Sequence, residues 1–393
     1  MKILYYSPHP HLQIDAPTGY GTHMREMIKA WRLMGIEVKT LIAGDLLFPE
    51  REESSLRQRD TGSKSFLKKL LPTLIWESLK DLRLMLYDFK LEKELGAMID
   101  SFEPDFIYER VAYIQNSGIK VARKKGIKHI AEINAPYPEE RVMFSGKSLF
   151  LETARNAERE VLVYSHGVSV VSSALKEHFE KCLPDSSLKI RVIPNAVNQS
   201  EVSHNRDAVN QLKEQYKLQG CCVIGFVGSI FPYHGVDILI EAFSKIPGEQ
   251  LRMLVVGDGE TLPELKSKAR ALGVLNRVIF TGSVPHREVY TFIELMDVCC
   301  MAKSNWYGSP VKIFEYGLMR KAVIAPDVVP VRDVMTDKDG VLVEPTVKSL
   351  QNAFKKLIDS PEFRDEIAAN WHRKVISQYT WDVAAGNTLE LCM

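Results

Sequence analysis

The sequence has 393 residues, of which 45% are hydrophobic and 26% are charged. This composition is that of an ordinary globular protein and excludes an intrinsically disordered chain; the length favours two domains over one. Lys and Arg (51) nearly balance Asp and Glu (50), so the chain lacks the overall positive field of a nucleic-acid-binding protein. We therefore expect a soluble protein with no nucleic-acid partner, in which any anion site is local.

The cysteines and the N-terminus indicate a cellular compartment. Six cysteines occur without a C-x-x-C pair, a pattern typical of structural thiols in a reduced protein rather than of a metal site. The apolar run at the N-terminus is too short for a signal peptide, and no uninterrupted apolar segment reaches about 18 residues. We expect a cytoplasmic protein that does not span a membrane.

In the first half of the chain, strand-like apolar runs alternate with amphipathic segments of helical length. A helix is expected at 21–33, and strands are expected at 3–6, 37–42, 106–108, 129–133 and 167–171. This alternation is typical of βαβ units, which build a parallel sheet covered by helices.

A second series of the same kind follows. Its strands are expected at 223–227, 251–256, 277–280, 298–301, 322–325 and 341–343. The turn-rich segment 194–198 and the polar run to 206 join the two series. We predict two doubly wound, Rossmann-like domains, one at 1–200 and one at 201–380, with a helix at 381–393 packing back on the first.

The segment 64–95 has two interpretations. It mixes basic with large apolar side chains: Lys68, Lys69, Lys80 and Arg83 with Phe66, Leu67, Leu70, Leu71, Leu74, Ile75 and Trp76. One interpretation is an amphipathic surface that meets a membrane or a lipid-linked acceptor. The other is a pair of ordinary helices with one face in the core.

In doubly wound folds ligands bind at the carboxyl ends of the strands, so the loops there are candidate sites. The first loop, 16–23, contains Gly19, Tyr20 and Gly21 between the first strand and the first helix. Its glycines would let the backbone approach a bound anion at the helix N-terminus. A flexible loop without a ligand would also explain them.

The second loop, 225–236, again runs from a strand through a glycine turn to a helix. Gly228 would give a pyrophosphate access to backbone amides, and His234 would meet a phosphate oxygen near the helix start. The alternative for His234 is a loop or capping histidine. The segment 255–260 repeats the pattern, although Gly-Asp-Gly also makes a tight turn without a ligand.

The third loop, 307–317, is the most informative. Ser309 is the expected N-cap and Pro310 the first helical residue, so Gly308 and Ser309 would present free amides to a phosphate. Glu315 falls at the border of the apolar helix face, where a ribose could partner its carboxylate. The alternative is an exposed glutamate that pairs with Lys312.

Several segments, in this order, resemble glycosyltransferase family 4. They are 19–21, 192–197, 225–229, 255–259, 278–284, 309–316 and 379–381. The resemblance implies a GT-B fold, in which two Rossmann-like domains face a cleft. It also implies a nucleotide-sugar donor and transfer with retention of the anomeric configuration without a metal.

The resemblance also implies roles for individual residues. Glu315 matches the glutamate that holds the nucleotide ribose, Gly228 the glycine under the pyrophosphate, and 282–284 the backbone that reads the base. The predicted catalytic residues are Glu315, Lys312, His234 and Arg110. The predicted donor-binding residues are Gly228, Ser229, Gly282, Ser283, Val284, Tyr307, Gly308, Ser309 and Pro310.

Three positions depart from the family pattern. Tyr307 stands where the family usually has a glutamate on the donor sugar. Ser229 and His234 occupy the neighbourhoods of the usual phosphate-binding Arg and Lys. The stretch that should hold the N-terminal catalytic histidine reads 108–110, Tyr-Glu-Arg.

The function expected is therefore a hexosyltransferase without a cofactor. Its partners would be a nucleotide-sugar donor and a small-molecule, glycan or lipid-linked acceptor, with peripheral contact at the inner face of a membrane. A nucleotide-sugar 2-epimerase of the same fold and a non-catalytic nucleotide-sugar-binding subunit are the alternatives. The one D-x-D, Asp337 to Asp339, reads as a solvated turn, and no metal-ligand cluster is visible.

Overall fold

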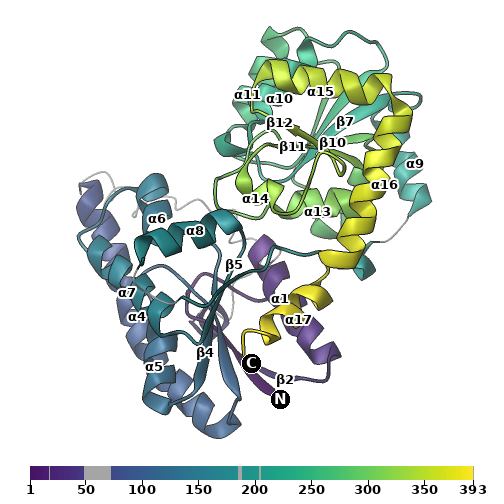
Figure 1. The fold of residues 1–393 in the computed structure, drawn as a ribbon. Coiled ribbons are helices and arrows are strands. Elements are labelled where there is room, and N and C mark those ends of the chain that lie inside the picture. The colour runs from purple at the N-terminus through teal and green to yellow at the C-terminus, as the bar shows by residue number, and fades with distance from the viewer. Residues whose placement is uncertain (17, 48–71, 185–187, 203–204, 393) are drawn as a thin grey trace. The chain divides into compact units, whose positions relative to one another are not determined.

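The computed structural model describes residues 1–16, 18–47, 72–184, 188–202 and 205–392. It divides into two compact units, the first comprising 1–193 and 384–393 and the second comprising 194–383. Each unit is an α/β layer structure around a parallel sheet (Figure 1).

Unit 1 contains a six-stranded parallel sheet in the order β2-β1-β3-β4-β5-β6. Its strands are β1 (Lys2–Ser7), β2 (Glu37–Ile42), β3 (Phe106–Arg110), β4 (Lys128–Ile133), β5 (Gly167–Val170) and β6 (Ile190–Val192). Its helices are α1 (Gly19–Leu33), α2 (Ala43–Leu47), α4 (Thr73–Phe102), α5 (Ser117–Lys125), α6 (Tyr137–Ser145), α7 (Leu151–Tyr164) and α8 (Ser173–Cys182). The short strand β6 was not expected from the sequence.

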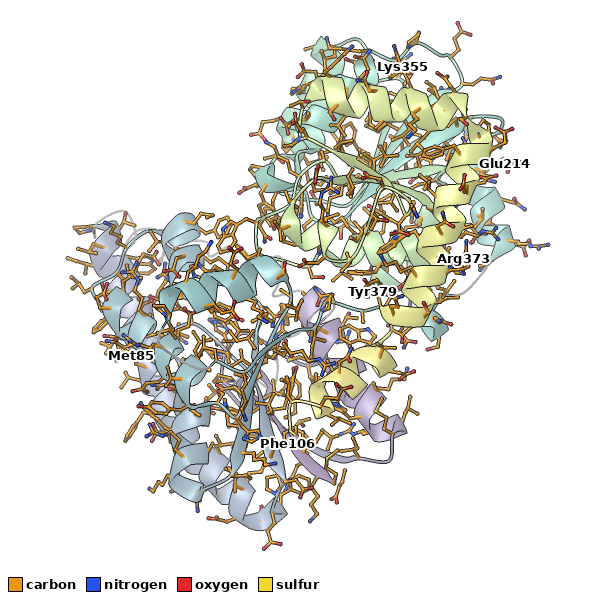
Figure 2. The ribbon with its side chains drawn as sticks, in the orientation of Figure 1. Met85, Phe106, Glu214, Lys355, Arg373 and Tyr379 are labelled. Carbon is orange, nitrogen blue, oxygen red and sulfur yellow. The ribbon has the colours of Figure 1, made fainter. Side chains whose placement is uncertain are left out.

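Helices cover both faces of this sheet because alternate strand residues point to opposite sides. Leu4 and Tyr6 of β1 pack in a cluster with Leu91 of α4. Tyr5, between them, packs against Trp31 of α1, with tilted rings whose centroids are 6.2 Å apart. Phe106, at the start of β3, lies buried among the packed side chains of this unit (Figure 2).

The last helix, α17 (Trp381–Leu389), contributes its second half to unit 1. The indole Nε1 of Trp31 donates to the Ala385 carbonyl (3.3 Å) and to Thr388 Oγ1 (3.2 Å). A β-carbon on Gly167 would lie 3.1 Å from the Leu391 side chain, so the C-terminal segment packs directly on β5.

Unit 2 contains a second six-stranded parallel sheet in the order β12-β11-β10-β7-β8-β9. Its strands are β7 (Cys222–Val227), β8 (Leu251–Val256), β9 (Val278–Gly282), β10 (Val298–Cys300), β11 (Ala322–Pro326) and β12 (Val341–Val343). Its helices are α9 (Arg206–Gln215), α10 (Val236–Ser244), α11 (Leu262–Ala271), α12 (Val289–Glu294), α13 (Val311–Leu318), α14 (Val329–Arg332), α15 (Val347–Asp359) and α16 (Pro361–Gln378). Three 3-10 turns complete it: η2 (Gln199–Glu201), η3 (Pro232–His234) and η4 (His286–Glu288).

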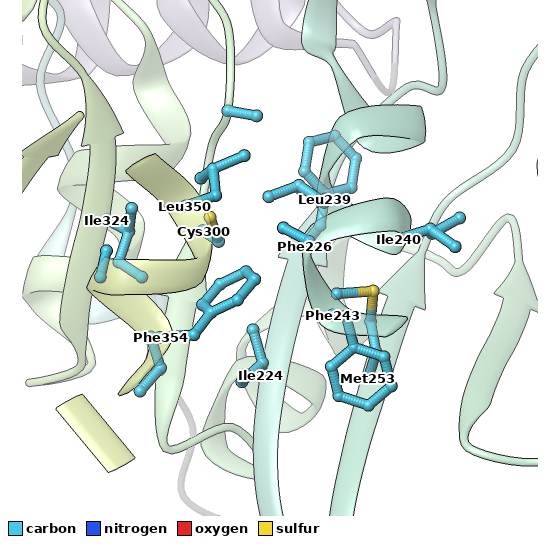
Figure 3. Close-up of a cluster of buried hydrophobic side chains, with 14 of the residues drawn as sticks. Ile224, Phe226, Leu239, Ile240, Phe243, Met253, Cys300, Ile324, Leu350 and Phe354 are labelled. Atoms are coloured by element: carbon cyan, nitrogen blue, oxygen red, sulfur yellow. The ribbon is translucent and has the colours of Figure 1, made fainter. Parts of the chain in front are cut away.

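Two apolar clusters sandwich the second sheet. Ile224 and Phe226 of β7 pack with α10 and α15, where Phe243 and Phe354 are fully buried (Figure 3). Val223 and Val227, on either side of this pair in the strand, face the opposite cluster, which includes α13 and α16. The adjacent Cys299 and Cys300 are buried on opposite faces of this sheet as free thiols, and Cys222 is half-buried in β7.

Candidate functional site

The strand order of unit 2 reverses between β7 and β10. In open parallel sheets ligands bind outside the carboxyl ends of the strands at such a switch point. The loop after β7 carries Gly228 and Ser229, and the loop after β10 leads to Pro310 and α13. Most of the predicted donor-binding residues therefore lie in the two loops at this switch point.

Lys312, in the first turn of α13, is half-buried, and its Nζ is buried beside Gly228. Its Nζ lies 4.3 Å from the centroid of the Phe226 ring and would lie 2.9 Å from a β-carbon on Gly228. This nitrogen has no hydrogen-bond partner among the described residues. Burial lowers the pKa of Lys312 to about 7, although the Glu315 carboxylate acts in the opposite direction. Because an unpaired buried ammonium is costly, this position favours an anionic ligand.

Glycines allow the loops after β7 and β8 to pack closely together near Lys312. Gly228 has a φ of 134°, and Gly257, at the end of β8, has a φ of 136°. A β-carbon on Gly257 would stand 2.0 Å from the Gly228 carbonyl oxygen, and one on Gly259 would stand 2.2 Å from the Ile230 oxygen. The Gly-Asp-Gly turn thus lets the loop after β8 support the loop after β7, which is a structural role.

His234 is the last residue of η3 and faces back toward this loop. Its Nδ1 donates to the Ser229 carbonyl at 2.6 Å, because a carbonyl oxygen can only accept. Burial and the nearby Lys312 lower the pKa of His234 to about 4. The imidazole is therefore neutral at pH 7.

Glu315 lies one turn beyond Lys312 and is half-buried. No ion pair joins the two side chains in the described part of the chain, so the surface pair allowed by their spacing is not formed. Burial raises the pKa of Glu315, opposed by His286 and Lys312. His286 follows the segment 282–284 by two residues, so Glu315 lies near the loop that was expected to read the base.

That loop begins where β9 ends. Gly282 has a φ of 73°, and its carbonyl accepts from Gly257 N (3.0 Å) and from Thr281 Oγ1 (2.8 Å). Ser283 is exposed and Val284 is half-buried. Their backbone therefore lies at the surface near Glu315.

The segment 307–310 differs from the sequence-based prediction. The residue that caps α13 is Pro310, and the helix begins at Val311 without a side-chain cap. The Ser309 hydroxyl accepts from Asn195 N (3.1 Å), and the Gly308 amide donates to Asn305 Oδ1 (2.6 Å). The Gly308 amide, which was expected to be free, is thus already used, and the Ser309 hydroxyl does not cap the helix.

Tyr307 is also buried in this loop. Its side chain is only 3% exposed, and its ring lies edge-on to Trp306 at 5.2 Å. Asn195 Nδ2 donates to the Ser309 carbonyl at 2.6 Å, which ties the start of unit 2 to this loop. From the sequence, Asn195 was noted only as part of the hinge segment 192–197, and Asn305 was not noted.

Unit 1 has its own switch point, between β1 and β3. The loop after β1 leads to Gly19 and Tyr20, the first residues of α1, and Arg110 ends β3. Thr18 caps α1 and accepts from Gly21 N at 3.4 Å. A β-carbon on Gly21 would stand 2.2 Å from the Ala16 carbonyl oxygen, so Gly21 is required by the loop itself, whereas Gly19 faces open space.

A buried charge cluster joins these two elements. Glu132 Oε1, near the end of β4, accepts from Arg110 Nη1 and from Asn134 Nδ2 (2.6 Å), and it lies 3.2 Å from His23 Nε2 of α1. Although burial acts in the opposite direction, His23 and Arg110 hold the pKa of Glu132 well below its usual value. Sequence reasoning missed Glu132, but a carboxylate inside an apolar strand is a signal that could have found it.

Acidic side chains elsewhere are used in turns. Asp339 is buried and accepts from Thr336 N (3.0 Å) and Lys374 Nζ (3.2 Å), so it is not a solvated residue as expected. Asp337 lies 3.8 Å from Arg332. Over the described ranges, no three His, Cys, Asp or Glu side chains are grouped so that they could hold a metal ion.

Comparisons with known proteins agree with this geometry. The family model "Glycosyltransferase Family 4" matches residues 17–201, and "Glycosyl transferases group 1" matches residues 210–374. HepE of Anabaena, solved in complex with UDP-glucose, superposes with a TM-score of 0.71 at 19% identity over 99% of this chain and 98% of that one. The GT-B fold expected from the sequence is confirmed.

Two curated relatives have named activities. The chain is 29% identical over 183 residues to alpha-D-kanosaminyltransferase of Streptomyces kanamyceticus, covering 46% of this chain and 47% of that protein. It is 28% identical over 232 residues to the phosphatidylinositol N-acetylglucosaminyltransferase GPI3 subunit of Saccharomyces cerevisiae, covering 57% and 50%. The chain spans about half the length of these relatives. It belongs to glycosyltransferase family 4.

Proposed function

We propose that this protein transfers a sugar from a nucleoside diphosphate sugar to an acceptor hydroxyl, with retention of configuration and without a metal. Unit 2 would bind the donor and unit 1 the acceptor. The observation that carries the proposal is the ammonium of Lys312, which is buried beside Gly228 without a partner in the described part of the chain. A diphosphate supplies the counter-charge that this ammonium lacks.

The roles of the donor residues follow from their positions. Lys312 would neutralise the departing diphosphate, and Gly228 would let that group approach the backbone. Glu315 would accept hydrogen bonds from the ribose hydroxyls. The neutral His234, with Nδ1 donating to Ser229, leaves Nε2 to accept from a hydroxyl of the sugar.

In the transfer, the bond between the anomeric carbon and the diphosphate oxygen breaks. The acceptor oxygen bonds to the same carbon on the same face, and its proton leaves with the diphosphate. The enzyme would act mainly by holding both reactants in place and by stabilising the leaving charge. No redox cofactor is needed, because no electrons leave the reactants.

For the acceptor we propose a polar, hydroxylated molecule. The cluster of Glu132, Arg110 and His23 at the unit 1 switch point offers both charge signs near the carboxyl ends of the strands. The relatives named above suit a small amino-sugar compound or a glycan carried by a lipid. With a lipid-linked acceptor the protein would work peripherally at the cytoplasmic face of a membrane. No helix of the described residues is long and apolar enough to span one.

The test begins with UDP-, GDP-, ADP- and dTDP-sugars in a thermal-shift panel. A donor at about 100 times its dissociation constant should stabilise the protein by about 2.7 kcal/mol. That donor is then incubated with candidate acceptors, with and without EDTA, and the products are analysed by NMR. We expect a glycoside with the anomeric configuration of the donor in both conditions.

Other outcomes would contradict the proposal. An altered sugar nucleotide without any glycoside would identify a 2-epimerase. Tight donor binding without turnover of any acceptor would identify a non-catalytic subunit. Activity that EDTA abolishes and a divalent ion restores would contradict the metal-free mechanism.

A further inference from the structure

In the N-terminal half of α4, polar side chains face the protein interior and large apolar side chains face solvent. Its buried residues there are Glu77, Ser78, Asp81 and Asp88. Its outward residues include large apolar side chains that are 41–74% exposed: Leu74, Ile75, Leu79, Leu82, Leu86 and Phe89. An ordinary surface helix has the opposite arrangement. Of the two interpretations of this segment, an apolar face in the core holds where Leu91 and Leu95 are buried, but not for these six residues. Residues 64–71 lie outside the described part.

Specific hydrogen bonds hold the polar face inward. Arg141 Nη2 of α6 donates to Glu77 Oε2 (2.6 Å) and Asp81 Oδ1 (3.2 Å). Tyr113 OH donates to Asp81 Oδ2 at 2.9 Å. These contacts fix the rotation of the helix, so the outward direction of its leucines is a defined feature of the fold.

Hydrogen bonds also hold a buried acid two turns further along α4. Asp88 Oδ2 accepts from the amides of Asn116 (2.9 Å) and Ser117 (3.0 Å) at the start of α5. Burial raises the pKa of Asp88 to about 6, so it is a costly side chain to place inside. The fold accepts that cost while leaving Leu86 and Phe89 in solvent.

The outward side chains form one continuous stripe. Ile75, Leu79, Leu82, Leu86 and Phe89 alternate in steps of four and three residues, which keeps them on one helix face over about 20 Å. Leu149, 69% exposed, lies beside this helix, since its amide donates to Ser78 Oγ at 2.9 Å. We call the five residues Ile75, Leu79, Leu82, Leu86 and Phe89 the α4 apolar stripe.

Two basic side chains, Arg83 and Lys90, are exposed beside the stripe, whereas the acids Asp81 and Asp88 of the same stretch are buried. Lys80 is also exposed but pairs with Glu77, and Lys93 is followed by the exposed Glu94. Met85 marks this helix in Figure 2. An apolar stripe with basic flanks matches the surface of an anionic bilayer, where acyl chains take the leucines and headgroups take the cations.

We propose that the α4 apolar stripe docks this protein on an anionic lipid surface, with the helix lying flat in the interface. A second copy of the chain is a poorer occupant, because antiparallel pairing about Leu82 would bring the Arg83 side chains of both copies together. The proposal goes beyond sugar transfer. Donor binding depends on unit 2, so the two can fail separately.

The experiment is flotation of the full chain with vesicles of phosphatidylcholine alone or with 30% phosphatidylglycerol, as a roughly membrane-like anionic fraction. We expect binding to the anionic vesicles. The double variant Leu82→Gln/Leu86→Gln should weaken it by about tenfold or more, since each leucine loses its apolar burial. Leu272→Gln, on an exposed part of unit 2, should leave binding unchanged.

A charge variant separates the two contributions. Arg83→Gln/Lys90→Gln should weaken binding to anionic vesicles by about tenfold or more while leaving the weak binding to neutral vesicles unchanged. Nucleotide affinity and melting temperature should match the parent in both double variants, because the changed side chains are exposed.

Three results would overturn the proposal. Equal flotation of parent and Leu82→Gln/Leu86→Gln would exclude the stripe. A parent dimer in lipid-free solution that this variant abolishes would identify a second copy as the occupant. A clear loss of melting temperature in the variant without lipid would show that the chain's own segment 48–71 covers the stripe.

Discussion

The ammonium nitrogen of Lys312 lies 2.9 Å from the position that a β-carbon on Gly228 would occupy. The absence of a side chain at Gly228 is therefore what allows the lysine to reach the end of β7. Both residues lie at the switch point of the second sheet, where the doubly wound fold collects its ligands. The predictions below depend mainly on this arrangement.

Gly228→Ala should impair nucleotide binding. The new β-carbon would displace Lys312 Nζ, and the φ of 134° is strained for alanine, so we expect a loss of about tenfold or more in affinity and about 1–2 kcal/mol in stability. Gly273→Ala is the control, because its φ of 71° is also positive while nothing lies within 4 Å of its β-carbon. Calorimetry should show normal affinity for this control. Equal affinities for both variants would rule out a diphosphate site at Lys312 and Gly228.

Nucleotide binding should take up protons above pH 7. The pKa of Lys312 is lowered to about 7 by burial, and a bound diphosphate would raise it by favouring the charged form. Affinity should fall as pH rises above 7, by up to about tenfold per unit until the pKa of the complex is reached. Titrations at pH 8 in two buffers of different ionisation enthalpy measure the uptake. A parent protein that exchanges no proton would contradict the assignment.

Glu315→Gln should weaken nucleotide binding by roughly 1.5 to 3 kcal/mol, the range for hydrogen bonds to a charged group. The loss should vanish when the ribose is replaced by a 2′,3′-dideoxyribose, because the hydroxyl partners are then absent. The variant should remain folded, since the carboxylate makes no ion pair with Lys312 in the described structure. Parent-like affinity in a folded Glu315→Gln protein would refute the ribose role.

Glu132→Gln should destabilise unit 1. The carboxylate is 3% exposed and compensates the Arg110 guanidinium, so its loss leaves a buried positive charge and should cost about 3–5 kcal/mol. Glu390→Gln removes an exposed pair with Arg191 and should cost less than about 1 kcal/mol. Denaturant unfolding measures both. Similar small losses would mean that the Glu132 cluster is not the electrostatic centre of this edge.

The sequence predicted the alternation of strands and helices and the glycine loops well, because both follow from local patterns. The apolar run that forms β7 is continuous because both of its faces are buried, and the glycine turn follows it directly. Ser309 was assigned as a cap from its place before Pro310, but Asn195, distant in sequence, takes its hydroxyl. Such a tertiary contact overrides a local preference and leaves no local signal.

The rotation of α4 was also beyond a sequence-based prediction. A helix with an apolar stripe and a polar stripe can bury either one, and periodicity alone favours the apolar stripe. The choice depends on Arg141, Tyr113 and Ser117, which are supplied by later segments of unit 1. The charge state of His234 likewise depends on its burial beside Lys312, not on its position in the loop.

The central claim is that Lys312 binds the diphosphate of the donor, and calorimetry on Lys312→Met tests it most directly. The matched control is Lys355→Met, an exposed lysine of α15 remote from the switch point (Figure 2). We predict that Lys312→Met weakens nucleoside diphosphate binding by roughly 1.5 to 3 kcal/mol, while the ligand-free protein melts at the same or a higher temperature because an unpaired buried charge is removed. Lys355→Met should match the parent in both. A folded Lys312→Met protein that binds the nucleotide as tightly as the parent would contradict the account.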